Sequence, residues 1–178
     1  TTVTTNATVD VSTRGGTTAY SSSTVTLSNT VNAVNDAPVA SGSATLTAID
    51  EDTTNPSGAT VSSLFSSNFS DSTDTVSGGS SANTLAGIAI TSYTRDATKG
   101  EWQYSTNGSS WTTISSSISA ASSSLTFKST DYLRFLPAAN WNGSAPTLTV
   151  ALIDSSTTVS TNATVDVSTR GGTTAYSS

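Results

Sequence analysis

The chain contains no cysteine, no methionine and no histidine. Without cysteine there can be no disulfide framework and no thiolate metal site. The missing histidine removes the commonest general base, the Ser-His-Asp arrangement and nearly every kind of zinc site. We therefore expect a protein that is not an enzyme.

Charged residues are also scarce. Six Lys and Arg stand against 12 Asp and Glu, which gives a formal net charge of −6. An acidic chain with scattered basic residues repels phosphate backbones, so we expect no nucleic-acid binding. No apolar run approaches the roughly 20 residues that a membrane-spanning helix requires, so we expect no membrane insertion.

An internal repeat is the most informative feature that is present. Residues 5–22 read TNATVDVSTRGGTTAYSS, and residues 161–178 repeat them letter for letter, at an offset of 161 − 5 = 156. A period of that size corresponds to a domain, because solenoid repeats are only a few tens of residues long. The sequence therefore predicts a tandem array, whose partners are neighbouring identical repeats arranged head to tail.

The remaining composition predicts an all-β fold. Ser and Thr occupy 72 of the 178 positions, yet many of them alternate with apolar residues, and Thr is favoured on the solvated face of a strand. Short alternating runs separated by turn residues predict a β-sandwich. The predicted strands are 7–13, 23–34, 43–49, 58–65, 85–93, 101–105, 110–114, 124–129, 132–137 and 146–154.

Two local patterns add detail to this prediction. EWQYSTNGSSWTTI (101–114) is typical of a hairpin, with Asn107 and Gly108 as the residues of positive φ at its turn. SSLFSSNF (62–69) is compatible either with one helical turn or with a loop that closes one end of the sandwich.

The few acidic residues gather at predicted strand ends. Asn35 and Asp36 follow one strand, Asp50, Glu51 and Asp52 follow the next, and Asp154 ends a later one. Ca²⁺ takes six to eight oxygen ligands from flexible acidic loops, so these residues are candidate Ca²⁺ ligands. Asp and Asn are also common in solvated turns, which is the alternative interpretation here and the one equally open for Asp71, Asp74 and Asp131.

VNAVNDAP (31–38) resembles the joint between immunoglobulin-like or cadherin-like repeats of giant bacterial surface proteins. The segments 100–111, 132–154 and 169–178 are similar to repeats of large RTX-type adhesins. The resemblance implies a β-sandwich extender domain at the extracellular bacterial cell surface, often with Ca²⁺ in its linkers. It implies that Asn35 and Asp36 form the ion-binding pair of the joint, with Glu51 and Asp52 as partners. The joint here carries one acid where cadherins carry several.

The position of this joint predicts the domain organisation. We expect residues 1–35 to be the end of a preceding repeat or a donor segment, and residues 36–178 to be a sandwich without its final strand. That strand would be a second copy of STVTLSNTVNAVN (23–35). Residues 1–35 could complete a preceding domain, fold back onto their own domain, or insert into a neighbour by β-strand addition.

We therefore expect a structural or adhesive repeat that extends a surface fibre and is stiffened by Ca²⁺ at its joints. The alternative is a carbohydrate-binding module that stacks sugar rings on exposed aromatic side chains, for which Trp102, Trp111 and Trp141 are the candidates.

Overall fold

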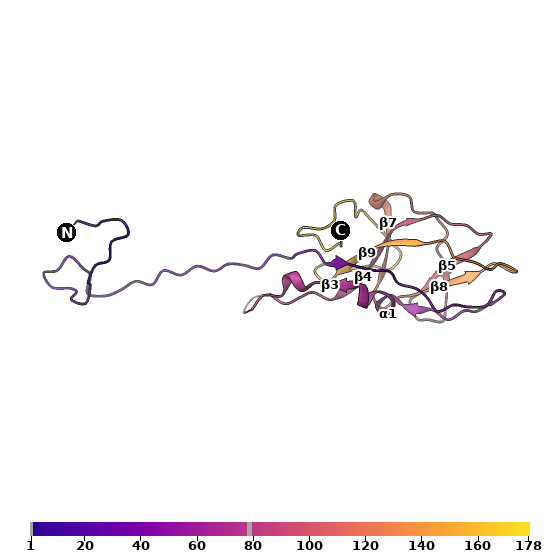
Figure 1. Ribbon diagram of the computed structural model, residues 1–178, viewed down its shortest axis with the longest axis horizontal. Coiled ribbons are helices and arrows are strands. Elements are labelled where there is room, and N and C mark those ends of the chain that lie inside the picture. The colour runs from indigo at the N-terminus through magenta and orange to yellow at the C-terminus, as the bar shows by residue number, and fades with distance from the viewer. Residues whose placement is uncertain (1, 78–79) are drawn as a thin grey trace. The chain divides into compact units, whose positions relative to one another are not determined.

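Figure 1 shows the computed structural model, which describes residues 2–77 and 80–178. The chain divides into two compact units, Thr1–Asn32 and Ala33–Ser178. The boundary between them lies close to the predicted joint at Asn35 and Asp36. Each unit is described by itself below.

The first unit has turns but no helix or strand among its described residues. Its clearest feature is a turn in which Gly15 N–H donates to the Tyr20 carbonyl at 2.9 Å and Thr18 N–H donates to the Gly15 carbonyl at 3.1 Å. Residues 23–32 are extended and exposed, with Val25 96% and Leu27 97% accessible. The predicted strands 7–13 and 23–34 therefore have no sheet partner here.

The second unit contains all the regular secondary structure that the structure describes. Its helical segments are α1 (Val61–Phe65), η1 (Ser66–Asn68), η2 (Ser72–Asp74) and η3 (Ala121–Ser123). Its strands are β1 (Val39–Ala40), β2 (Ala59–Thr60), β3 (Phe69–Ser70), β4 (Leu85–Tyr93), β5 (Gly100–Ser105), β6 (Thr112–Thr113), β7 (Ser124–Lys128), β8 (Tyr132–Pro137), β9 (Leu148–Asp154) and β10 (Ala163–Val165).

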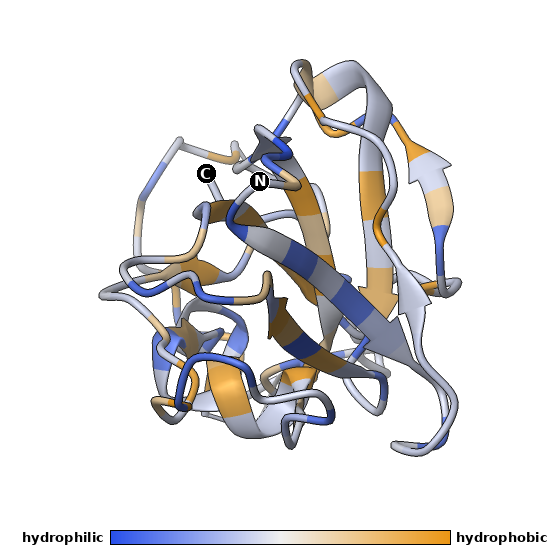
Figure 2. Ribbon diagram, turned by 90° about the vertical axis from the view of Figure 1, so that its right-hand side faces the viewer, coloured by the Kyte–Doolittle hydropathy of each residue, from blue (hydrophilic) through white to orange (hydrophobic). Residues whose placement is uncertain are grey.

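These strands form two four-stranded antiparallel sheets and one small pair. One sheet has the order β10-β7-β4-β9, the other has the order β2-β8-β5-β6, and β1 pairs with β3. Apolar and polar residues alternate along several strands, as the hydropathy colouring in Figure 2 shows. The prediction of a mostly β protein is thus confirmed, and its two antiparallel sheets fit a β-sandwich.

The main core lies between the two sheets. It joins Ile88 and Ile90 of β4, Phe127 of β7 and Leu152 of β9 with Leu133 of β8. A second, smaller cluster covers the opposite face of β4 and β9. Its buried members are Ala89, Ile153, Val159, Val167 and Ala175, so the segment after β9 folds over the outer face of the first sheet.

Residues 7–13, 23–34 and 43–49 form no strand in the structure, and the prediction of a strand over 58–65 is also wrong. Residues 58–65 form only the two-residue β2 before helix α1 begins. The Thr60 hydroxyl accepts a hydrogen bond from Ser63 N–H at 3.1 Å and so caps the helix. Val61, Leu64 and Phe65 then fall at i, i+3 and i+4, which places three apolar side chains on one face of a helix. For 62–69, the structure therefore contains the helical alternative.

The predicted hairpin is confirmed in its pairing and corrected in its turn. Gln103 pairs with Thr113 and Tyr104 pairs with Thr112. Gly108 has a φ of +72°, but Asn107 does not have a positive φ. The Asn107 side-chain oxygen instead accepts hydrogen bonds from the backbone of Ser109 and Ser110, both at 2.9 Å, and orders a longer loop.

No helix in the described ranges is both long enough and apolar enough to cross a lipid bilayer.

Candidate functional site

An acidic cluster lies where the second unit begins. It comprises Asp36, Asp71, Asp74 and Asp154, together with the amides of Asn35 and Asn83. The residues come from four places in the sequence: the segment before β1, the stretch from Asp71 to Asp74 that follows β3 and includes η2, the residues before β4, and the end of β9 (Figure 1).

Asn35 connects the start of this unit to the end of β9. Its Nδ2 group donates to Asp154 Oδ2 at 3.4 Å and to the Thr174 carbonyl at 3.2 Å. The neighbouring Ala37 N–H donates to the Gly172 carbonyl at 2.7 Å. The predicted joint is therefore hydrogen-bonded to the end of β9 and to the turn at residues 171–176, which follows β10.

Asn83 and Asp74 form the centre of the network. Asn83 Nδ2 donates to Asn35 Oδ1 at 2.7 Å and to Asp74 Oδ2 at 3.2 Å. Asp36 N–H donates to the other oxygen of Asp74 at 2.9 Å. The carboxylate of Asp74 thus accepts from one backbone and one side-chain N–H, and both donors are neutral.

Asp71 is the least well satisfied member. One of its oxygens, Oδ2, accepts from Asn83 N–H at 2.5 Å. The other, Oδ1, is buried and has no hydrogen-bond partner in the described part of the chain. Burial raises the pKa of Asp71 above its ordinary value, and the negative charges of Asp74, Asp154 and Asp36 raise it further against the opposing bond from Asn83.

The cluster buries negative charge without a basic partner. Asp71 and Asp74 are each 5% exposed and Asp154 is 0% exposed. The two ion pairs found among the described residues, Arg95–Glu101 and Lys99–Asp96, involve none of them. Buried carboxylates are normally paired with a cation or coordinate a metal ion, so this concentration of charge calls for a counter-ion.

The donor types fit Ca²⁺, which prefers carboxylate and amide oxygens. Within the described ranges, however, no three Asp, Glu, His or Cys side chains converge closely enough to form a metal-binding group as they stand. The carboxylates are oriented by N–H and O–H donors, among them Ser156, which donates to Asp154 Oδ1 through its N–H at 2.8 Å. Coordination of a cation would require these side chains to turn toward one another.

Asp50, Glu51 and Asp52, the other predicted ligands, are exposed and bond to a different region. Asp52 Oδ1 accepts from Asn140 N–H at 2.6 Å, and Glu51 Oε2 accepts from Asn142 Nδ2 at 3.2 Å. Both partners lie in the loop that precedes β9, whereas Asp154 ends that strand. Within this unit the structure therefore brings together Asn35, Asp36 and Asp154 but not the Asp50–Asp52 run.

Sequence reasoning did not assign Asp71, Asp74 and Asn83 to the same group as Asn35. Asp71 and Asp74 were open to a turn interpretation, and their three-residue spacing was the one available signal. Asn83 gives no signal, because its bond to Asn35 joins positions 48 apart in the chain.

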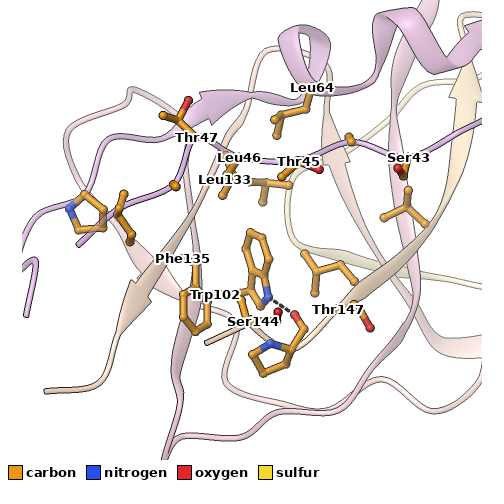
Figure 3. Close-up of a pocket in the computed structure, with 18 of the residues that line it drawn as sticks. Ser43, Thr45, Leu46, Thr47, Leu64, Trp102, Leu133, Phe135, Ser144 and Thr147 are labelled. Carbon is orange, nitrogen blue, oxygen red and sulfur yellow. Dashed lines mark hydrogen bonds between the residues drawn. The ribbon is translucent and has the colours of Figure 1, made fainter. Parts of the chain in front are cut away.

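A second feature of this unit is an apolar cavity of about 930 Å³. Figure 3 shows Trp102 within it, with Thr45, Leu46 and Thr47 on one side and Ser144 and Thr147 on the other. The Trp102 indole N–H donates to the Pro146 carbonyl at 2.6 Å. Further apolar lining comes from Leu64, Leu133, Phe135, Leu148 and Val150.

The three tryptophans occupy different surroundings, and each is only partly exposed. Trp102 and Trp141 both pack edge-on against Phe135, at centroid distances of 5.6 and 6.0 Å. Trp111 covers the guanidinium of Arg134 at 4.1 Å. They therefore do not form one aromatic platform: two line the cavity, and the third stacks on a cation.

Comparison of the chain with family models, with curated proteins and with solved structures finds no match.

Proposed function

We propose that this protein is a structural or adhesive repeat of a large extracellular bacterial surface protein or filament, with an immunoglobulin-like or cadherin-like sandwich as its unit. The exact recurrence of residues 5–22 at a domain-sized offset of 156 supports this, because repeats at such an interval supply length and spacing. The joint at Asn35 and Asp36 connects one repeat to the next.

Calcium at the joint supplies the stiffness in this proposal. The observation that carries it is the burial of Asp71, Asp74 and Asp154 with no basic residue beside them in the described ranges. Bound Ca²⁺ would neutralise their repulsion and accept the unpartnered Asp71 Oδ1 as a ligand. Because Asn35 and Asp36 belong to the same network, the ion would also fix the direction in which the chain enters the unit.

Thermal unfolding of the 178-residue chain in EDTA and in millimolar Ca²⁺ tests this proposal. A ligand present at 100 times its Kd stabilises the folded state by about 2.7 kcal/mol. For a domain of this size that corresponds to a rise in Tm of about 5–10 °C.

The matched variants are Asp154→Asn and Asp166→Asn. Asp154 is buried in the acidic cluster, whereas Asp166 is exposed and accepts only local bonds from Ser168. The calcium-dependent rise should disappear in the first variant and persist in the second. Equal Tm values in EDTA and Ca²⁺ for the unmodified chain would contradict the calcium joint.

A carbohydrate-binding module is the second candidate. One observation favours it: Trp102 and Trp141 line the same cavity, and both pack against Phe135. Titration with oligosaccharides should then quench tryptophan fluorescence, and Trp141→Ala should abolish the change. An unaltered spectrum across neutral, acidic and amino sugars would count against this function.

A further inference from the structure

The strand β9 is only partly paired along its outer edge. β4 pairs with it on one side over its whole length. On the other side, Ile153 bridges to Tyr176, Asp154 N–H donates to the Ala175 carbonyl at 3.0 Å, and Ser177 N–H donates to the Leu152 carbonyl at 2.9 Å. Within the described residues, no backbone hydrogen bond continues this pairing along 148–151.

A second unpaired segment faces the same cavity. Residues 43–49 alternate polar and apolar side chains and are predicted to be a strand, yet they pair with no other strand in the described part of the chain. Ala44 and Leu46 are half-buried, while Ser43, Thr45 and Thr47 are exposed. This segment and the start of β9 both line the cavity, together with core residues of the two sheets.

We propose that the segment Ser23–Val34 of a second copy of this chain occupies this cavity as an added strand, antiparallel to β9 and parallel to residues 43–49. This inference specifies the contact in the head-to-tail array and so rests on the proposed function. The unpaired backbone of residues 148–151 and of residues 43–49, together with the apolar side chains that line the cavity, is thus available to a single extended segment.

The internal repeat fixes the register. Tyr20-Ser21-Ser22 repeats Tyr176-Ser177-Ser178, and the latter run already pairs with β9. In an antiparallel pair, each step forward on one strand is a step back on the other. Continuing from Tyr176 opposite Ile153 therefore places Ser23 opposite Val150, Thr24 opposite Thr149 and Val25 opposite Leu148.

This register matches the side-chain pattern of both strands. Val150 and Leu148 are half-buried and line the cavity, whereas Thr149 between them is exposed. Since residues directly opposite each other share a face of the sheet, Val25 and Leu27 would enter the cavity. Thr24 and Thr26 would lie on the solvated side, and a slip of one residue would exchange the two sets.

The chain cannot fill the cavity with its own Ser23–Val34 because of how Asn35 is held. In this register the donor strand runs from the Leu152 end of β9 past Leu148, so the donor's Val34 lies beyond Leu148, the residue at which β9 begins. Asn35, however, bonds to Asp154 at the other end of β9. The seven residues of β9 span roughly 23 Å, so Val34 and Asn35 of one chain would have to lie at least that far apart. They are consecutive residues, whose Cα atoms are about 3.8 Å apart, so a chain cannot fill its own cavity in this way.

The same geometry makes the contact head to tail. The donor's Asn35 and Asp36 would emerge beyond Leu148, the end of the cavity at which Asp50 and Glu51 contribute to the lining. The acidic cluster of one copy would then follow directly on the Asp50–Asp52 run of the preceding copy. All six predicted ion ligands would meet between two copies, although they are separate within one.

Disulfide trapping with a Thr24→Cys, Thr149→Cys double variant tests the register. The unmodified chain has no cysteine, so every disulfide would come from the introduced pair. The hydrogen bonds on either side of Ile153 and Tyr176 join their neighbours, so Ile153 and Tyr176 are a non-hydrogen-bonded pair. Hydrogen-bonded and non-hydrogen-bonded pairs alternate along antiparallel strands, so Thr149 and Thr24 would be another non-hydrogen-bonded pair. Their Cα atoms would be about 4.5 Å apart, within the range of a disulfide.

The matched control is Thr30→Cys with Thr149→Cys. Thr30 lies on the same side of the donor strand, six positions away, which is roughly 20 Å from Thr149. Oxidation of the test variant at high protein concentration should give covalent dimers and longer chains on a non-reducing gel, and the control should give none. A synthetic peptide of residues 23–35 should suppress the longer chains.

Two results would overturn the inference. The first is a folded test variant that forms no more disulfide than the folded control, and the second is a disulfide that forms only within monomers. The circular dichroism spectrum of each variant shows whether it is folded. Running the oxidation in EDTA and in Ca²⁺ separates the two proposals. Covalent chains in both buffers, without a Ca²⁺ effect on Tm, would support strand addition and reject the calcium joint.

Discussion

At the scale of single residues, the molecule treats its buried charges in two ways. Arg134 is 6% exposed, and its guanidinium donates to the side chains of Gln103 and Asn55 at 2.8 and 2.7 Å beneath the ring of Trp111. Asp71 has one N–H donor and several like charges around it. The Arg134 guanidinium is thus stabilised by neutral acceptors and an aromatic ring, whereas the Asp71 carboxylate has no cation beside it and one oxygen without a hydrogen-bond partner in the described residues.

Substitution of Asp71 by Asn should stabilise the calcium-free protein at neutral pH. The folded state raises the pKa of Asp71 above the unfolded value, so folding opposes its ionisation. The loss of stability that ionisation of Asp71 causes is absent below about pH 4, the pKa of Asp in the unfolded chain. It grows as the pH rises from that value to the higher folded pKa, and it is complete above the folded pKa. Removing it should add about 1 kcal/mol, or about 2–4 °C in Tm, in EDTA at pH 7.

The difference between Asp71→Asn and the unmodified chain should vanish at pH 3, and the variant should lose the response to Ca²⁺. Asp166→Asn is the control, because local bonds from Ser168 lower the pKa of this exposed group. A destabilised Asp71→Asn variant in EDTA at pH 7 would show that the Asp71 carboxylate is already well satisfied.

At the scale of elements, the repeated 18 residues show what a local sequence can specify. Gly171 N–H donates to the Tyr176 carbonyl at 2.9 Å, as Gly15 does to Tyr20, and Asn6 and Asn162 share a φ of +56°. Yet Ala163–Val165 forms β10 against β7, whereas residues 7–9 form no strand. Turns arise from the local sequence, but a strand requires a partner.

The two copies also provide a matched pair of substitutions. Val167 is 0% exposed in the cluster over the outer face of β4 and β9, and Val11, its counterpart, is 41% exposed. Val167→Ala should destabilise the protein by about 2 kcal/mol through lost burial and the cavity it leaves. Val11→Ala should have no measurable effect. Urea unfolding compares the two, and equal midpoints would contradict this account of the second cluster.

At the scale of the whole molecule, exposed apolar side chains and an apolar cavity are complementary. Leu27 is 97% exposed in a segment of alternating sequence, and the cavity beside β9 has two unpaired edges in the described residues. Such surfaces favour association, and the proposed contact would generate a filament because it is head to tail.

Leu27→Asp should therefore prevent self-association without changing the stability of the monomer. A carboxylate placed in the cavity would be buried without a partner, which should weaken association by at least 100-fold. Ser28→Asp is the control, since that side chain would face solvent in the proposed register. Light scattering over a range of concentrations measures the mass, and equal association of the two variants would argue against the predicted face.

Alternation of apolar and polar residues was sufficient to predict β4, β5, β7, β8 and β9, because period-two patterns bury one face of a strand. It was insufficient for 58–65, where the Thr60 cap and the spacing of Val61, Leu64 and Phe65 give a helix. It also could not decide whether 23–34 and 43–49 pair, because pairing depends on a neighbouring strand and not on the segment itself.

The candidate site divides in the same way. The sequence by itself determined the repeat and the acidic ends of the predicted strands and predicted the joint at Asn35 and Asp36, since these depend on neighbouring residues. Only the tertiary structure placed Asp71, Asp74 and Asn83 around Asn35 and left the Asp50–Asp52 run beside the loop before β9. The physical reason is that burial and electrostatic repulsion depend on distances between residues far apart in the chain, which only folding sets.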